Sequence, residues 1–225
     1  MNHTTAILFW TIIGVLTLLN WIGAAQKNWK LYFATKPFVL AALILYFGLN
    51  GGLRADRLPF MVGLVFSLLG DIFLIPHSYR WFMAGLVAFF CTHLSYLIGF
   101  SQQPASPAPT ILCSIAAVAL IGFLCWYILR KTQGKPELKS MRKVYLPYSV
   151  VLVLMAETAI LCWFRPGWSK PAAALVGLGS IGFLTSDILH ACERMGKRIP
   201  MAKFWIILTY HLAQFMIVTG ILLKG

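Results

Sequence analysis

Two aspartates lie inside apolar segments that are long enough to cross a lipid bilayer. Asp71 lies in SLLGDIFLI and Asp187 in GFLTSDILH, and only six acidic residues occur among all 225. A carboxylate near the middle of a membrane helix costs about 2.5–3.5 kcal/mol on insertion scales, so it usually faces a cavity and marks a functional site. The pair predicts acid–base chemistry inside the membrane, provided that the fold brings the two side chains together.

Small residues accompany both aspartates. Gly63, Ser67 and Asp71 fall on one row of a helix, at positions i, i+4 and i+8, and Gly179 lies two turns before Asp187. Small side chains let a neighbouring helix approach closely. We therefore expect both carboxylates to point into a helical bundle rather than toward lipid.

Other polar side chains fall at a similar depth. His93 lies near the middle of its segment with Tyr96 one turn on, Tyr210 and Gln214 lie one turn apart, and Lys36 precedes an apolar run. A single histidine or tyrosine in a membrane helix is more often a hydrogen-bonding group between helices than a catalyst. Two aspartates at equal depth shift the balance toward a functional site.

The composition predicts the elements that must position these residues. Hydrophobic residues make up 60% of the chain and charged residues 11%, and apolar runs of about 20 residues, the length needed to cross a bilayer, recur throughout. We expect an all-α, polytopic membrane bundle formed by a single domain over 1–225, because each span must satisfy its own backbone. The five cysteines form no CxxC pair and are expected to pack as small apolar residues. The eight expected spans are 5–25, 36–49, 58–75, 81–100, 110–129, 144–164, 171–190 and 203–223.

The cationic residues behind the net charge of +13 lie mostly in the connections on one side of the expected bundle. Fourteen Lys and Arg residues fall in one set of alternate connections and five in the other. The positive-inside rule places the richer side in the cytoplasm, so both termini are expected on the non-cytoplasmic side, of the inner membrane in a bacterium. The charge thus predicts no nucleic-acid partner, and attraction to anionic lipid headgroups is secondary. The expected second span is short and begins at a proline. If this segment did not cross the membrane, every later span would cross in the opposite direction.

The chain also contains signs of an internal duplication. Asp71 and His93 in spans three and four correspond to Asp187 and His211 in spans seven and eight. Corresponding spans are four apart and run in the same direction. This favours a 4+4 parallel repeat about an axis normal to the membrane.

An ordered set of short motifs resembles the YhhN-like lysoplasmalogenases over nearly the whole chain. The set comprises Thr35-Lys36-Pro37, Gly70-Asp71, Gly85, Phe89, His93, Tyr96, Ser186-Asp187, Tyr210 and Gln214. The resemblance implies an eight-span fold and a hydrolase that needs no metal or other cofactor. It also implies a lysophospholipid substrate, whose vinyl ether is cut to a fatty aldehyde and glycerophosphoethanolamine or glycerophosphocholine. The two family aspartates fall on Asp71 and Asp187.

Vinyl ether chemistry explains why two carboxyl groups would be needed. Vinyl ethers hydrolyse through acid, so one carboxyl must stay protonated near neutral pH while a second stabilises the cation or orients water. Burial and repulsion between like charges both favour the protonated form of one member of a pair, and glycosidases use a similar pair across an oxocarbenium-like transition state. The sequence leaves open which of Asp71 and Asp187 is the acid.

The remaining polar groups receive supporting roles. His93, Tyr96, Tyr210 and Gln214 are expected to line the site or to hold the carboxylates and the water in place. Lys36 is expected to bind the substrate phosphate at the cytoplasmic interface, while the hydrocarbon chain lies between apolar spans among the membrane lipids.

Three alternatives use the same residues. Asp71, Asp187, His93 and His211 are side-chain types that bind Zn²⁺ or Fe²⁺, but no HExxH or similar spacing supports a metal site. An intramembrane aspartyl protease also pairs two aspartates, but its second proline-alanine-leucine motif is not found. A proton-coupled transporter of small molecules or lipids could use the same buried carboxylates in a 4+4 repeat.

Overall fold

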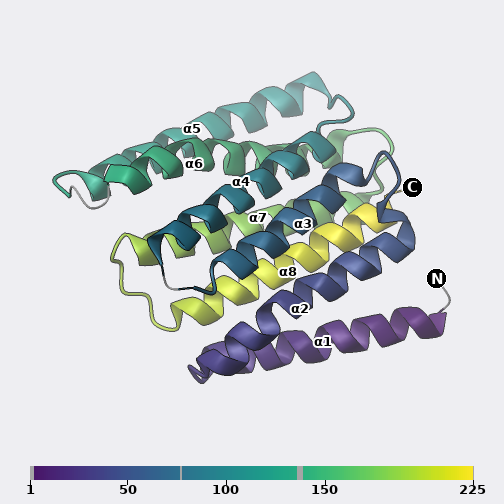
Figure 1. The fold of residues 1–225 in the computed structure, drawn as a ribbon. Helices are drawn as coiled ribbons and strands as arrows, with labels where there is room; N and C mark the ends of the chain where they lie inside the picture. The colour runs from purple at the N-terminus through teal and green to yellow at the C-terminus, as the bar shows by residue number, and fades with distance from the viewer. Residues whose placement is uncertain (1–2, 77, 136–138, 225) are drawn as a thin grey trace.

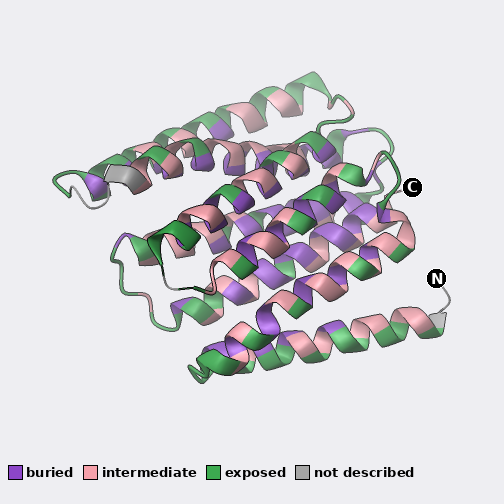
Figure 2. Ribbon diagram, viewed as in Figure 1, coloured by how far each residue is buried: buried purple, intermediate pink, exposed green. Residues whose placement is uncertain are grey.

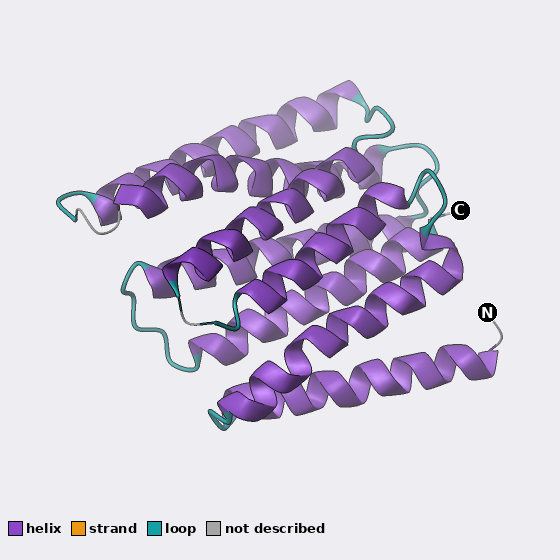
Figure 3. Cartoon of the chain, in the orientation of Figure 1, coloured by secondary structure: helices purple, strands orange, loops and turns teal. Residues whose placement is uncertain are grey.

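The structure is a computed structural model that describes residues 3–76, 78–135 and 139–224. In these ranges every regular element is helical (Figure 3). The long helices are α1 (His3–Ala25), α2 (Trp29–Phe47), α3 (Leu58–Phe73), α4 (Tyr79–Phe100), α5 (Pro107–Thr132), α6 (Lys139–Ile160), α7 (Lys170–Arg194) and α8 (Ala202–Leu223). Two short segments extend them: the π-helical η1 (Gly48–Gly52) after α2 and the 3-10 helix η3 (Leu161–Phe164) after α6.

Seven of these helices are long and apolar enough to cross a membrane. The exception is α3, whose 16 residues span about 24 Å at 1.5 Å per residue. The chain is therefore an all-helical, multi-pass membrane protein. Of the eight expected spans, seven meet this criterion of length and composition, and the third is a shorter apolar helix.

The boundaries of two spans differ from those expected. The second span was expected over 36–49, but α2 begins at Trp29, where the side chain of Asn28 accepts a hydrogen bond from the backbone N–H of Leu31. Pro37 therefore lies inside the helix, as membrane helices tolerate. The sixth span was expected to begin at 144, but α6 begins at Lys139 and contains Pro147. Neither shift removes a span, so the order of the connections is unchanged.

The helices pack as sequential pairs, and both termini lie at the same end of the bundle (Figure 1). The closest pairs are α7 with α8, α3 with α4 and α1 with α2, whereas α5 packs mainly on α6. The helices α1 and α5 lie at the two edges of the bundle and expose much of their apolar surface (Figure 2). This is the pattern expected of helices whose outer faces contact lipid.

Small residues bring the central helices close together. A Cβ atom at Gly220 of α8 would lie 2.8 Å from the carbonyl oxygen of Ala172, and one at Gly179 of α7 would lie 3.0 Å from that of Ala213. Both are too short for ordinary packing. The α3 row of small residues faces inward as expected, and Ser67 is fully buried.

Candidate active site

Both aspartates line one polar cavity at the end of the bundle opposite the termini. At this end α3 and α7 finish while α2 and α8 begin. The cavity has a volume of about 70 Å³, and one water needs about 10–15 Å³ of such space, so several waters or a small polar group fit. It is lined by Tyr32, Phe33, Lys36, Asp71, Leu74, Leu86, Phe89, Tyr148, Ser186, Asp187, His190, Arg194, Lys203, Ile206, Ile207 and Tyr210.

Asp71 is held by partners on both of its carboxyl oxygens. Lys36 Nζ lies 3.0 Å from Oδ1, and the Tyr210 hydroxyl donates a hydrogen bond of 3.0 Å to Oδ2. The Asp71 side chain is only 1% exposed. A buried charge is tolerated only when it is paired and hydrogen-bonded, and these two contacts meet that condition by joining α2, α3 and α8.

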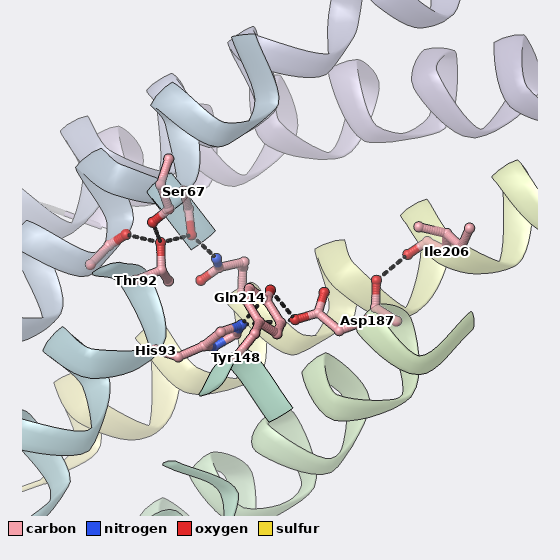
Figure 4. A network of polar contacts seen from close by, with 10 residues as sticks. Ser67, Thr92, His93, Tyr148, Asp187, Ile206 and Gln214 are labelled. Carbon is pink, nitrogen blue, oxygen red and sulfur yellow. Dashed lines mark hydrogen bonds and ion pairs between the residues drawn. The ribbon is translucent and has the colours of Figure 1, made fainter. Parts of the chain in front are cut away.

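Asp187 has different partners and is more accessible. The Tyr148 hydroxyl donates a hydrogen bond of 2.7 Å to Oδ2, and His93 Nε2 lies 2.8 Å from the same oxygen and 3.0 Å from the Tyr148 oxygen (Figure 4). Its side chain is 13% exposed, compared with 1% for Asp71. The two carboxyl groups therefore share a cavity but have separate hydrogen-bonding partners.

An aromatic wall keeps these partners in place. The ring of Phe183 on α7 meets His93 at 4.7 Å and Tyr210 at 5.4 Å between centroids, both edge to face. Phe89 meets Tyr210 edge to face at 5.9 Å. Such pairs contribute about 0.5–1.5 kcal/mol each beyond the area they bury. These ring contacts restrict the orientations of the His93 and Tyr210 side chains, which each contact one carboxyl group.

Tyr96 and Gln214 do not reach the carboxylates. The Tyr96 hydroxyl donates to Gln214 Oε1 at 2.7 Å, and Gln214 Nε2 donates to Ser67 Oγ at 2.9 Å. Ser67 continues the network to Thr92 at 3.1 Å (Figure 4). Because α4 and α8 both begin at the cavity end, Tyr96 and Gln214 lie about one turn deeper than His93 and Tyr210. Their network ties α3, α4 and α8 together beneath the cavity.

Lys36 is not placed as a free phosphate ligand. Its ammonium group is buried and paired with Asp71, because α2 begins earlier than expected and carries Lys36 inside the bundle. Two other cations, Arg194 and Lys203, line the cavity and form no ion pair with any residue that the structure describes. The Arg194 guanidinium lies 4.0 Å from the centroid of the Phe82 ring.

Sequence reasoning gave no role to several residues that line the cavity. Tyr148 precedes Asp187 by 39 residues, and no local spacing connects the two. Arg194 and Lys203 were counted only as part of a basic connection that determines topology. His190 had a usable signal, because it lies three residues after Asp187 and so on the same face of α7. Its ring meets Phe82 edge to face at 5.9 Å.

No metal-binding cluster is present in the described ranges: no three His, Cys, Asp or Glu side chains there are placed to hold an ion together. The polar groups at the cavity are instead two carboxyls, each with its own hydrogen-bond donors, and a set of cations. Such a site can donate a proton, stabilise a cation and bind an anion.

Comparisons with known proteins identify the family of this chain. The chain is 28% identical to lysoplasmalogenase TMEM86A of Homo sapiens over 205 residues, which is 88% of this chain and 80% of the relative. It is 27% identical to lysoplasmalogenase TMEM86B of Sus scrofa, over 88% of this chain and 78% of the relative. No solved structure matches it. The YhhN family model matches residues 31–221, a range that includes both aspartates and every residue that lines the cavity, and the chain therefore belongs to the YhhN family.

Proposed function

We propose that this protein is a lysoplasmalogenase. It hydrolyses the vinyl ether bond of a lysophospholipid and releases a fatty aldehyde and glycerophosphoethanolamine or glycerophosphocholine. The names of its relatives support this activity. The observation that carries the proposal is that Asp71 and Asp187 line the same polar cavity within the helical bundle.

The two carboxyl groups have different roles in the acid-catalysed reaction: one transfers a proton and the other stabilises positive charge. A carboxylic acid transfers its proton to the β-carbon of the vinyl ether, which leaves an oxocarbenium ion and a carboxylate. Water adds to the cation and returns one proton to that carboxylate, and the hemiacetal then collapses to aldehyde and alcohol. The second carboxylate stabilises the cation electrostatically, which is worth most in a site that excludes bulk water.

The substrate phosphate requires a cation that is not already paired. We assign this role to Arg194 and Lys203, in place of Lys36. Both line the cavity without an ion-pair partner among the described residues, although Glu193 attracts Lys203 at longer range. An arginine can bind two phosphate oxygens at once.

Replacement of the aspartates tests the function. Purified protein in detergent with a chelator should release fatty aldehyde from lysoplasmalogen, while Asp71→Asn and Asp187→Asn should lower the rate at least about 100-fold, the lower range of general acid catalysis. Asp56→Asn is the matched control, because the Asp56 side chain is 40% exposed, pairs with Arg54 and does not line the cavity. Gel filtration shows whether each variant is folded. Near-normal turnover by either cavity variant would end this assignment.

The same assay separates the alternatives. Loss of activity on chelation, restored by Zn²⁺ or Fe²⁺, would favour a metal hydrolase. Uptake of a lipid or small molecule into proteoliposomes without aldehyde formation would favour the proton-coupled transporter.

We further propose that α3 is an eighth span and that both termini lie on the non-cytoplasmic side. The placement of both ends of the chain at one end of the bundle supports an even number of crossings. The contacts of the aspartates also have the symmetry of a 4+4 repeat. Asp71 on α3 receives Lys36 from α2 and Tyr210 from α8, while Asp187 on α7 receives Tyr148 from α6 and His93 from α4.

A further inference from the structure

A second cavity adjoins the polar one and differs from it in chemical character. It lies between α5, α6 and α7, has a volume of about 50 Å³ and is lined mostly by apolar side chains. We call it the apolar groove, and it is lined by Leu124, Tyr127, Ile128, Tyr145, Tyr148, Ser149, Leu152, Asp187, Ile188, Ala191, Cys192 and Met195. Tyr148 and Asp187 line both spaces. Asp187 thus stands where a polar space meets an apolar one.

The helix α5 places the apolar groove next to the bilayer. It lies at the edge of the bundle against α6 (Figure 1), and its outer side chains Leu112 and Val118 are 70% and 69% exposed. Leu124 and Ile128 turn inward and are buried. The groove is therefore separated from the lipid side of the bundle by a single peripheral helix.

The two carboxyl groups differ in how many of their oxygens are engaged. Both oxygens of Asp71 have partners, Lys36 on Oδ1 and Tyr210 on Oδ2. Both contacts of Asp187 end on Oδ2, and its Oδ1 has no partner among the residues that the structure describes. His93 and Tyr148 therefore hold the Asp187 carboxyl group while leaving one oxygen open to the site.

We propose, resting on the proposed function, that the apolar groove binds the alkenyl chain of the substrate and that Asp187 is the group that protonates it. The substrate is an amphiphile whose vinyl ether joins the hydrocarbon chain to the polar glycerophosphate. The wall formed by Asp187 and Tyr148 is the corresponding junction in the protein. With the chain in the groove and the phosphate in the polar cavity, the reacting bond lies against Asp187.

Each group then has a defined part in the reaction. The proton passes from Asp187 Oδ1 to the β-carbon, and the electron pair of the double bond forms the new C–H bond. The ether oxygen shares the resulting positive charge, which the Asp71 carboxylate stabilises without transferring a proton. Water adds to the oxocarbenium carbon and returns one proton to Asp187. Arg194, seven residues or about 10 Å further along α7, faces the phosphate side of the cavity.

A block in the apolar groove tests this placement. Ala191→Trp puts a large side chain in the groove, and Ala191→Leu puts a smaller one there. With lysoplasmalogens of long and short alkenyl chains, we expect the ratio of kcat/KM for the long to the short substrate to fall at least tenfold in Ala191→Trp and by less in Ala191→Leu. Ala119→Trp is the matched control, because Ala119 lies on the exposed outer face of α5 and lines neither space. Its ratio should equal that of the wild type.

The outcomes separate this inference from the function on which it rests. If the wild type releases aldehyde from both substrates but folded Ala191→Trp keeps the wild-type preference for chain length, the chain does not occupy the groove and the inference fails. If Ala191→Trp loses both activities in equal proportion, the inference fails as well. If the wild type releases no aldehyde from either substrate, it is the proposed function that fails.

Discussion

Two lysine side chains at the polar cavity face different surroundings. Lys36 is buried against Asp71, with 3.0 Å between Nζ and Oδ1. Lys203 lies in the first turn of α8 and lines the cavity, is exposed and has no ion-pair partner in the described part of the chain. The same residue type therefore contributes to stability at one position and is available to a ligand at the other.

Replacement of each lysine by methionine should separate these roles. Lys36→Met leaves Asp71 buried and unpaired, which costs about 3–5 kcal/mol, and we expect Tm to fall by at least about 6 °C at ~2 °C per kcal/mol. Lys203→Met should leave Tm within a few degrees and lower kcat/KM about tenfold or more, because a hydrogen bond to a charged group is worth about 1.5–3 kcal/mol. Thermal unfolding in one detergent and aldehyde release measure the two effects. A large KM increase without a loss of Tm in Lys36→Met would instead make Lys36 a phosphate ligand.

At the scale of helices, close approach between α7 and α8 depends on glycine. A Cβ atom at Gly179 would lie 3.0 Å from the Ala213 carbonyl oxygen and 2.9 Å from Ile217 Cγ1. Backbone atoms cannot turn aside as a flexible side chain can. Because Asp187 lies two turns further along α7, a shift of this helix also moves the site.

Alanine substitution at two glycines tests the contact between these helices. Gly179→Ala should destabilise the protein by about 1–3 kcal/mol, the usual cost of overpacking. Gly122 lies on α5 with no atom within 4 Å of the added Cβ, so Gly122→Ala should be neutral or stabilise by up to about 1 kcal/mol through helix propensity. The comparison is made by Tm in the same detergent. Equal Tm values for the two variants would show that α7 and α8 do not approach as closely as the structure indicates.

At the scale of the whole molecule, charge and fold divide the bundle into two ends. Ten of the cationic residues expected on the cytoplasmic side lie in the two connections after the fifth and seventh spans, at the same end as the polar cavity. The opposite end carries both termini. The cavity should therefore open toward the cytoplasm, where basic segments also attract anionic lipid.

Cysteine labelling tests this orientation. In a background without the five native cysteines, Lys197→Cys at the cavity end should react with a membrane-impermeant maleimide only after the membrane is opened. Ala55→Cys at the other end should react in intact cells, because the positive-inside rule places that connection outside. The reverse labelling pattern would place the cavity on the non-cytoplasmic side.

Hydrophobic periodicity and the lengths of apolar runs predicted the helices and the inward face of Asp71 correctly, because these features depend on neighbours within a turn or two of one helix. They could not predict where α2 begins, because Pro37 suggests the start of a helix, whereas the actual N-cap is Asn28. They also could not show that Gln214 pairs with Tyr96 rather than with a carboxylate, because one turn of depth decides between those partners.

The amino-acid sequence by itself determined the class of the protein, the helical rows that carry its acids and the charge difference between its ends. Only the tertiary structure decided that Lys36 pairs with Asp71, that Tyr148 and His93 hold Asp187, and that a polar and an apolar space meet at its carboxyl group. The reason is physical. Contacts between side chains 35 or more residues apart depend on how closely and at what depth separate helices pack, and the spacing along the chain does not specify either quantity.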